Sequence, residues 1–404
     1  MQLRENTNDL AEIINCHRPD LKSFEDVYRH LHTNPELSGQ EEQTAKIASD
    51  HLKATGFEVH TKIGGHGVAG VLRNGTGPTI LLRADMDALP VEEQTGLPYA
   101  STRHVKDESG ADKPVMHACG HDSHVATLMA AATLLHSARD NWQCWTTDYT
   151  TKSPSRTSCS RSMLTRMRAG TLNLRAGPLL TAADAFNVRV FGRGGHGSAP
   201  HTTIDPIVLG AAIVMRLQTI VSREVAPGKL AVLTCGSIHS GQSPNIIPAY
   251  LDLQLNVRTY DDKVRKRVCA SIHRIIEAEC MAAGVEKKPE IKLNYSTPST
   301  INDGKTIDAL RETFRPFFGD RLVDMEPPTA SEDFSLLATA VGAPYVMWMF
   351  GGTDPQTWDD AVAKGTVDEL PSNHSPFYAP VIQPTLRTGV DAIALGALTF
   401  LKRK

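Results

Sequence analysis

Apolar positions in the first 140 residues follow helical spacing at the start and strand spacing afterwards. Leu21–His32 and Gln43–Thr55 predict helices, and Gly56 is placed to end the second one. The strand-like runs that follow are Phe57–Ile63, Gly67–Leu72 and Thr79–Ala84, and an Ala- and Leu-rich helix is expected at Val125–Ser137. Because the run at 79–84 is short, apolar and partly β-branched, it predicts a buried central strand. This alternation predicts an α/β domain with a mostly parallel sheet.

A second pattern begins near Ala182. The expected elements are strands at Phe186–Phe191, Leu230–Ser237 and Tyr250–Thr259, with helices at Asp205–Val221 and Asp262–Ala283. Asp205 precedes a proline, as at many helix starts. This order predicts a small ferredoxin-like α+β domain. We therefore expect a larger domain of residues 1–181 and 293–404, with residues 182–292 inserted into it as a lid.

One segment, residues 141–168, departs from both patterns. Eleven of the twenty residues from Thr146 to Thr165 are Ser or Thr, and the window Trp142–Arg168 has no Val or Ile. β-branched aliphatic residues are what strands favour, and a core helix needs an apolar stripe. The segment therefore predicts neither a strand nor a core helix.

Composition narrows the class of protein without identifying it. The chain has 404 residues, 41% hydrophobic and 22% charged, which excludes a disordered, collagen-like or coiled-coil protein. Its formal charge of −3 gives no basic field for nucleic acid. Seven cysteines, a low and odd number, argue against a disulfide framework. We found no signal-like start and no stretch of about 18 apolar residues, so we expect no membrane association and a cytoplasmic location.

The densest chemistry lies between Met116 and His124, where three imidazoles, one thiol and one carboxylate fall within nine residues just before a predicted helix. Thiolate and imidazole are good ligands for zinc and similar metals, and Asp122 could orient an imidazole. Gly120 lets Cys119 and His121 face one ion. The alternative is a polar loop that caps the helix through Asp122 or Ser123.

Weaker signals lie elsewhere in the chain. Asp85 and Asp87 follow the predicted central strand, where α/β proteins gather ligands, although a solvated turn has the same composition. His196 projects from the glycine loop 192–201, which could also be an ordinary turn or a phosphate loop lacking its Lys-Ser/Thr ending. Taken alone, His374 suits a structural role and Arg258 a surface ion pair, although Arg258 could also clamp a carboxylate.

Together these motifs resemble a known family, the di-metal amidohydrolases and metallopeptidases that include aminoacylases, hippurate hydrolase and the plant indole-acetyl-amino-acid hydrolases. The resemblance covers about residues 20–140 and 169–404. It is carried by His32–Ser38, Arg83–Pro90, Thr95–Ser101, His117–His124, Gly194–His201, Asn245–Pro248, Val257–Thr259, Glu332–Phe334 and Asn373–Phe377. So many motifs in the right order make the resemblance highly specific.

The resemblance implies hydrolysis of the amide bond of N-acyl amino acids or small peptides with two divalent metal ions (Zn, Mn or Co). Cys119 would bridge the two metals, His121 would bind one of them, and His374 would be the distal ligand on the other. Asp87 would stand behind a ligand histidine. Other implied roles belong to the lid, which would also form a homodimer: His196 and Asn245 would hold the scissile carbonyl, and Arg258 would pair with the substrate carboxylate.

Three groups that this chemistry needs have no counterpart here. Family members carry a Pro-Ala-Glu-Glu stretch and a later His where this chain has residues 141–168. The first Glu takes the proton of the attacking water, and the second Glu and the His bind metal. The intruding composition is typical of coding sequence read out of frame, so our hypothesis is a frameshift or mis-spliced gene. The alternative is a genuine product that has lost catalysis, such as a non-catalytic dimeric binding protein of the same fold.

The frameshift hypothesis predicts a specific result. Reading the genomic DNA across codons 140–168 in the other two frames should reveal a Pro-Ala-Glu-Glu stretch and a downstream His. Sequencing the locus and its transcript checks this. If neither frame encodes those residues, the segment is genuine and the hypothesis is wrong.

Overall fold

The computed structural model describes residues 2–75, 77–106, 110–142 and 157–401, and the chain forms two compact units. Unit 1 comprises Met1–Ala176, Asn302–Met325 and Leu337–Lys404, and unit 2 comprises Gly177–Ile301 and Glu326–Leu336. Residues 143–156 of the departing segment lie outside the described residues.

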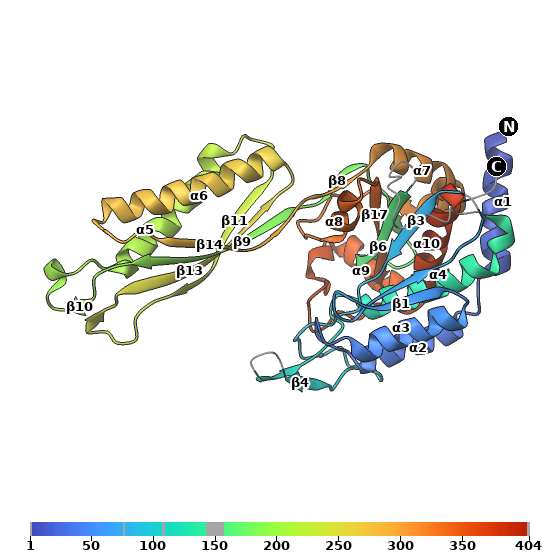
Figure 1. Cartoon of the computed structure of the whole chain (residues 1–404), viewed down its shortest axis with the longest axis horizontal. Helices are drawn as coiled ribbons and strands as arrows, with labels where there is room; N and C mark the ends of the chain where they lie inside the picture. The colour runs from blue at the N-terminus through green and yellow to red at the C-terminus, as the bar shows by residue number, and fades with distance from the viewer. Residues whose placement is uncertain (1, 76, 107–109, 143–156, 402–404) are drawn as a thin grey trace. The chain divides into compact units, whose positions relative to one another are not determined.

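Unit 1 carries the first group of predicted elements (Figure 1). Its helices are α1 (Gln2–His17), α2 (Lys22–Thr33), α3 (Glu42–Ala54), α4 (His121–Ser137), α7 (Gly304–Phe318), α9 (Pro355–Lys364) and α10 (Thr385–Leu401), while α8 (Phe334–Ala340) crosses the division between the units. Its strands are β1 (Glu58–Ile63), β2 (Gly67–Val71), β3 (Thr79–Arg83), β4 (His104–Lys106), β5 (Asp112–Pro114), β6 (Thr157–Arg168), β7 (Leu172–Asn173), β16 (Leu322–Val323) and β17 (Tyr345–Thr353). The helices and strands predicted before residue 140 are confirmed to within a few residues.

The central sheet of unit 1 has the strand order β16-β7-β17-β6-β3. All of its neighbouring pairs are parallel except β17 with β7, so the predicted mostly parallel sheet is confirmed. The predicted position of strand 79–84 was wrong, because β3 ends the row of described strands and Leu81 is 40% exposed. An apolar run indicates burial of a strand but not its place in a sheet.

The departing segment contains a strand, contrary to the sequence prediction. β6 runs for twelve residues and pairs in parallel with β3 on one side and β17 on the other (Figure 1). Backbone hydrogen bonds to two neighbouring strands do not depend on side-chain type, so this Ser-rich segment can still form a strand. Cys159, Leu164 and Met167 supply buried apolar contacts. Tertiary pairing thus overrides a weak local preference.

The core of unit 1 lies between the sheet and its helices. α4 and α10 pack against each other, and α10 also contacts β3, β6 and β17. Trp348 and Phe350 of β17 are fully buried among Leu134 of α4 and Val390 of α10. Burial of this apolar surface holds the carboxyl ends of β3 and β6 close to the start of α4.

Unit 2 forms a four-stranded antiparallel sheet of order β11-β13-β9-β14 with two helices packed on it. Its elements are β8 (Gly177–Leu180), β9 (Ala182–Phe191), β10 (Gly195–His196), α5 (Pro206–Thr219), β11 (Ala231–His239), β12 (Ile246–Ile247), β13 (Tyr250–Thr259), α6 (Asp262–Ala282) and β14 (Glu290–Thr297), while β15 (Thr300–Asn302) crosses the division between the units. In chain order, the sheet runs second, third, first, fourth, which is the predicted ferredoxin-like arrangement. Asp205 caps α5 by accepting from the Ile207 amide at 2.8 Å.

The helix α5 differs from expectation in its hydrophobicity. With its π-helical continuation it spans Pro206–Glu224 and is, by length and composition alone, apolar enough to cross a membrane. One such helix among the described ones is weak evidence, because core helices pass the same test. Leu209, Ile213 and Leu217 are buried against the sheet, whereas Val208 and Met215 are 67% and 71% exposed. Packing against the sheet explains the buried apolar residues of α5 but not the exposed Val208 and Met215.

Candidate metal centre

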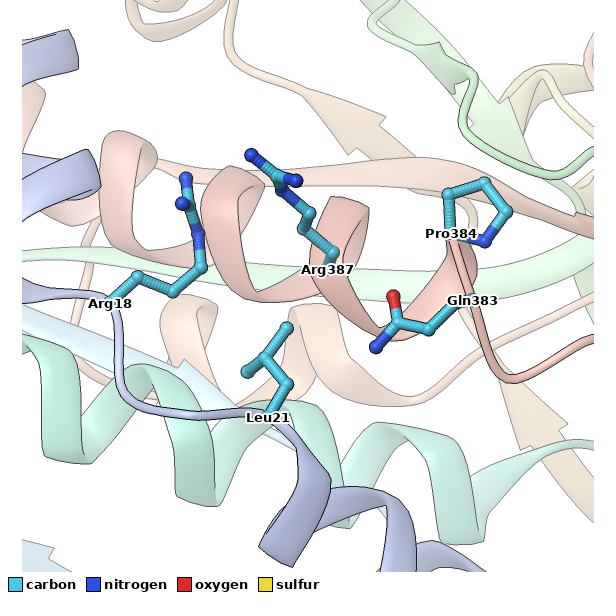
Figure 2. A pocket seen from close by; sticks show the side chains of 5 residues that line it. All are labelled: Arg18, Leu21, Gln383, Pro384 and Arg387. Carbon is cyan, nitrogen blue, oxygen red and sulfur yellow. The ribbon is translucent and has the colours of Figure 1, made fainter.

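One surface pocket of unit 1 lies apart from the candidate chemistry. It has a volume of about 440 Å³ and is lined by Arg18, Leu21, Gln383, Pro384 and Arg387 (Figure 2). Arg18 pairs with Asp391 at 2.6 Å. None of the residues singled out from the sequence lines this pocket.

The cluster predicted before a helix lies instead at its first turn. α4 begins at His121, and its N-cap is Gly120, which has a left-handed backbone with φ of 78°. Neither Asp122 nor Ser123 caps the helix, so that alternative was wrong. A Cβ at Gly120 would lie 2.7 Å from a methyl of the fully buried Leu164. The glycine thus permits both the turn and the close approach of β6.

Cys119 lies against the two imidazoles that the resemblance implied as ligands. Burial opposes ionisation, but hydrogen bonds with His121 and His374 lower the pKa of the Cys119 thiol to about 6. His374 is held in place by its amide, which donates to Ala118 O at 2.7 Å, and it adopts a left-handed backbone with φ of 75°. Asn373 Nδ2 donates to the carbonyls of Cys119 and Leu164, both at 3.1 Å. The three ligand-type groups therefore converge from two distant segments.

Asp87 stands behind His121. The Nδ1 atom of His121 lies 2.8 Å from the Asp87 carbonyl oxygen and 3.0 Å from its Oδ1. Burial raises the pKa of the Asp87 carboxyl, and the contact with His121 more than reverses this and lowers it. The arrangement fixes the ring and directs Nε2 away from Asp87.

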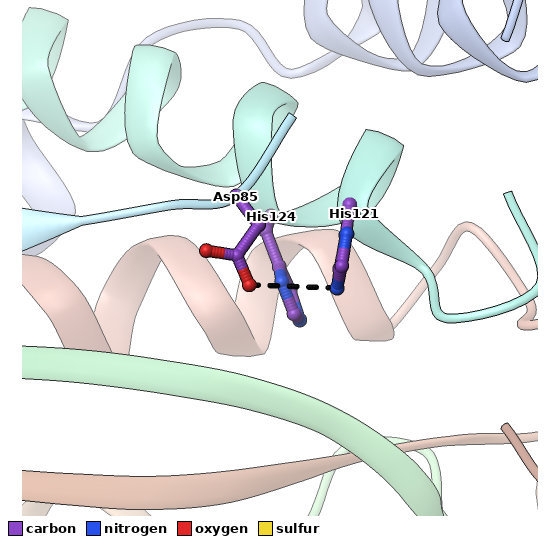
Figure 3. A group of neighbouring side chains, drawn as sticks. All are labelled: Asp85, His121 and His124. Carbon is purple, nitrogen blue, oxygen red and sulfur yellow. Dashed lines mark ion pairs between the residues drawn. The ribbon is translucent and has the colours of Figure 1, made fainter. Parts of the chain in front are cut away.

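A second group of ligand-type side chains lies beside the first. Ligand atoms of Asp85, His121 and His124 lie within 4.8 Å of one another, and Figure 3 shows the three side chains gathered where β3 ends and α4 begins. Asp85 Oδ2 is 3.5 Å from His121 Nε2. Asp85 was weighed from the sequence, but no role was assigned to His124.

The three histidines of the cluster have different environments. His117 is buried, and neither of its ring nitrogens has a hydrogen-bond partner in the described part of the chain. Burial lowers the pKa of His117 to about 4. His124 is also buried, and its Nε2 accepts from the Leu164 amide at 2.8 Å. His121 is the one whose outer nitrogen faces Cys119 and Asp85.

We tested whether these residues fit the two metal ions that the resemblance implies. Cys119, His121 and His374 offer a polarised thiol and two imidazoles, a donor set suited to one zinc-like cation. At the neighbouring position, Arg161 contacts Asp85 Oδ2, and Arg83 Nη1 lies 2.6 Å from Oδ1. The residues therefore fit one cation and do not fit a second.

Sequence reasoning missed a buried relay next to the cluster. His32 Nδ1 lies 2.7 Å from Asp122 Oδ2, and His32 Nε2 lies 3.0 Å from Glu93 Oε1. Burial disfavours a charged ring, but the contacts with Asp122 and Glu93 raise the pKa of His32 to about 10. Asp122 thus orients an imidazole, as expected, but that of His32. The one signal in the sequence that could have identified His32 is that it begins a motif, His32–Ser38, that resembles the family.

The remaining candidates lie in unit 2. His196 in β10 pairs with Ile246 in β12, and the Gly197 amide donates to the Asn245 carbonyl at 2.8 Å, so His196 and Asn245 are neighbours. A Cβ at Gly197 would lie 3.1 Å from that carbonyl oxygen, which confirms close backbone approach. None of the glycines at 192, 194, 195 and 197 has a positive φ. Arg258 lies apart from this hairpin in β13, with Nε and Nη1 donating to Asn256 and Ser331 at 2.8 and 2.6 Å.

An α/β unit with thiol, imidazole and carboxylate groups near the ends of parallel strands, joined to a ferredoxin-like unit, is the arrangement that the resemblance implies for a metal-dependent amidohydrolase. The chain belongs to the peptidase family M20/M25/M40, whose model matches residues 81–145. The peptidase dimerisation domain matches residues 182–283. The resemblance stated from the sequence is therefore confirmed.

Named relatives cover most of the chain. The hippurate hydrolase of Campylobacter jejuni is 35% identical over 333 residues, 77% of this chain and 84% of the relative. The thermostable carboxypeptidase 2 of Saccharolobus solfataricus is 33% identical over 422 residues, 97% of this chain and 99% of the relative. A dinuclear metal-binding M20 peptidase from Bacillus subtilis superposes with a TM-score of 0.72 at 26% identity, covering 94% of this chain and 98% of that one.

The buried relay yields a test of stability. Replacing His32 with Leu removes both imidazole contacts and leaves the Asp122 and Glu93 carboxylates buried without their shared cation. We expect a loss of about 3–5 kcal/mol in the free energy of unfolding, as for a broken buried pair. Urea denaturation followed by tryptophan fluorescence measures it.

The matched control is His104→Leu, because His104 pairs with Asp112 at 2.8 Å on the surface. An exposed pair contributes below about 1 kcal/mol. Equal losses in the two variants would contradict the assigned role of the relay.

Proposed function

We propose that this chain is built to act on the amide bond of N-acyl amino acids or small peptides, and that its site holds a single divalent cation bound by Cys119, His121 and His374. The observation that carries the proposal is the convergence of these three side chains, with Asp87 behind His121. Two relatives, a hippurate hydrolase and an N-acetyl-L-cysteine deacetylase, have names that specify N-acyl amino acids.

A divalent cation at such a site polarises the amide carbonyl and lowers the pKa of a bound water. The protein's contribution is to position the metal-binding side chains. Asp87 accepts from His121 Nδ1–H, which leaves Nε2 as a lone-pair donor. The contacts of Cys119 with two imidazoles favour its thiolate, which is the form that binds metal. Of the three metals that the resemblance implies, zinc and cobalt suit this thiolate and imidazole donor set better than manganese, which prefers oxygen ligands.

We assign substrate recognition to unit 2 and its predicted lid, residues 182–292. His196 is exposed, and its Nδ1 accepts from the Ser198 amide and hydroxyl at 3.1 and 2.8 Å, which leaves Nε2 directed outward. His196 and Asn245 would hold the scissile carbonyl or its oxyanion. Arg258, held by Asn256 and Ser331, would pair with the carboxylate of the amino-acid half.

We find no residue in this sequence to take the proton of the attacking water. The resemblance assigns this role to a glutamate in the part of the chain that residues 141–168 replace. Glu93 does not substitute for it, because its carboxylate is engaged with His32, Thr95 and the Ser101 amide. We therefore propose that the present sequence retains the binding groups and lacks turnover.

The alternative, a non-catalytic binding protein of the same fold, is favoured by one observation, the contact of Arg161 with Asp85 inside the site. The two functions differ in what a repaired segment does. Only an amidohydrolase scaffold regains turnover when the missing carboxylates and imidazole return.

We expect the purified full chain to bind one Co²⁺ with a thiolate-to-cobalt absorption band and to show no measurable hydrolysis of N-acetyl or N-benzoyl amino acids. Loss of a general base alone costs about 10²- to 10⁴-fold in rate. Replacing residues 141–168 with the corresponding segment of a relative that carries the Glu pair and the His should restore hydrolysis. Absorption spectroscopy and release of the free amino acid provide the two measurements.

Cys119→Ser is expected to abolish the cobalt band, and Cys16→Ser, an exposed free thiol, serves as the matched control. A folded repaired chain without hydrolysis of any N-acyl amino acid or small peptide would refute the proposed substrate class. Hydrolysis by the unmodified chain at the rate of the repaired one would refute the role of the missing glutamate.

We further propose a homodimer formed through unit 2 and a cytoplasmic location. The exposed residues Ile207, Val208 and Met215 of α5 give a second copy an apolar surface to cover. The six cysteines that the structure describes are free thiols, in keeping with a reducing compartment.

The double variant Val208→Glu with Met215→Glu should convert the dimer to a monomer, because it would bury four carboxylates in a two-fold interface. Sedimentation velocity measures the change. Leu293→Glu, on the opposite sheet edge β14 and 54% exposed, is the control and should leave the dimer intact. If the double variant remains dimeric, α5 does not form the interface.

A further inference from the structure

Arg161 enters the candidate centre from the middle of β6. In the parallel ladders it pairs with Arg83 of β3 and Met347 of β17, so its backbone position is set on both sides. Its side chain is 1% exposed and contacts Asp85 Oδ2. A guanidinium of this kind stays charged at every pH at which proteins fold. The site therefore contains a permanent positive charge, which belongs to the Arg161 side chain.

Both oxygens of Asp85 are engaged by cations of the chain itself. Arg161 contacts Oδ2, and Arg83 Nη1 lies 2.6 Å from Oδ1. The Asp85 side chain is itself only 10% exposed. Asp85 is thus already neutralised, although its position beside His121 would otherwise suit it to bind a metal.

His124 is also unavailable as a ligand in this arrangement. Its Nε2 accepts a hydrogen bond from the Leu164 amide, so the lone pair that would bind metal is in use. The amide belongs to β6, the strand that carries Arg161. The same strand therefore blocks two of the three members of the cluster Asp85, His121 and His124.

The positive charge of Arg161 also disfavours a second metal ion beside Asp85. A guanidinium has donors but no lone pair to offer a metal. A divalent ion next to Asp85 would face the positive charge of Arg161 in a buried setting, where repulsion is poorly screened. Entry of a second cation would require Arg161 to leave a buried contact.

We propose that the Arg161 guanidinium occupies the second cation position of this site as an internal substitute for a metal ion, and that a neutral side chain at residue 161 opens that position to a divalent cation. The inference rests on the proposed function in one respect, because it assumes that a first cation is bound by Cys119, His121 and His374. It concerns binding by this chain and does not depend on turnover.

The test is the stoichiometry of Co²⁺ bound to the purified full chain, measured by native mass spectrometry and by calorimetric titration. We expect one Co²⁺ in the unmodified chain and two in Arg161→Met, which keeps an unbranched side chain as far as the Nε position and removes the charge. The second ion would then share Asp85 with Arg83. It would displace only the neutral Leu164 amide from His124 Nε2. Arg161→Lys keeps a cation and should stay at one. The double variant Asp85→Asn with Arg161→Met should return to one.

The matched control is Arg166→Met on the same strand, because Arg166 pairs with Asp368 away from Asp85. It should also bind one ion. Circular dichroism and thermal unfolding verify folding, and Arg161→Gln replaces the Met variant if that variant does not fold.

Two ions in the unmodified chain would overturn the inference, whatever the variants do. One ion in folded Arg161→Met would also overturn it, while the first site and the proposed function would stand. No ion in either chain would refute the proposed function as well, so the two failures are distinguishable.

Discussion

The parallel pairing of β6 with both β3 and β17 is the constraint on which the candidate centre depends. This pairing sets Arg161 opposite Arg83 and carries the Leu164 amide to His124. It also holds Leu164 against Gly120, the residue from which Cys119 and His121 diverge. Because main-chain bonds define the register, the side chains of β6 meet the start of α4 whatever their chemistry. The strand thus determines which groups share the site.

The site shows how one scaffold can hold opposite electrostatic arrangements. Carboxylates at the end of a strand and imidazoles at the start of a helix can surround a metal ion or an arginine. In this chain, Asp85 meets two guanidinium groups, whereas Cys119 meets two imidazoles. The first group is balanced by the protein itself, and the second still has a thiol whose contacts favour its ionised form. The groups around Cys119 are therefore better able to bind a metal ion than the groups around Asp85.

Long amphipathic elements were predictable because their signal is local. Helices α2, α3 and α6 follow from apolar spacing, and the Asp205 cap follows from one side chain beside one amide. β6 was not predictable, because its Ser- and Thr-rich text has weak strand preference and its pairing partners are far away in the sequence. The place of β3 at the end of the described sheet also depended on distant partners.

The candidate site divides in the same way. Cys119, His121 and His374 were identified from residue types and motif order, and the structure brings these three together. His32 was missed as a site residue, since its partners Asp122 and Glu93 lie 90 and 61 residues away. The assignment of Asp122 to a specific imidazole needed the same long-range contact. His196 and Asn245 were named separately, and only the β10–β12 pairing shows them to be neighbours.

The sequence by itself determined the family and the two-part α/β and ferredoxin-like organisation, and it contains no Pro-Ala-Glu-Glu stretch in residues 141–168. These properties are carried by residue identity and by periodicities within one element. Tertiary structure alone decided that residues 157–168 form a central strand and that Arg161 reaches Asp85. The reason is physical: backbone pairing and buried charge contacts are set by neighbours in space, and a chain carries no local record of them.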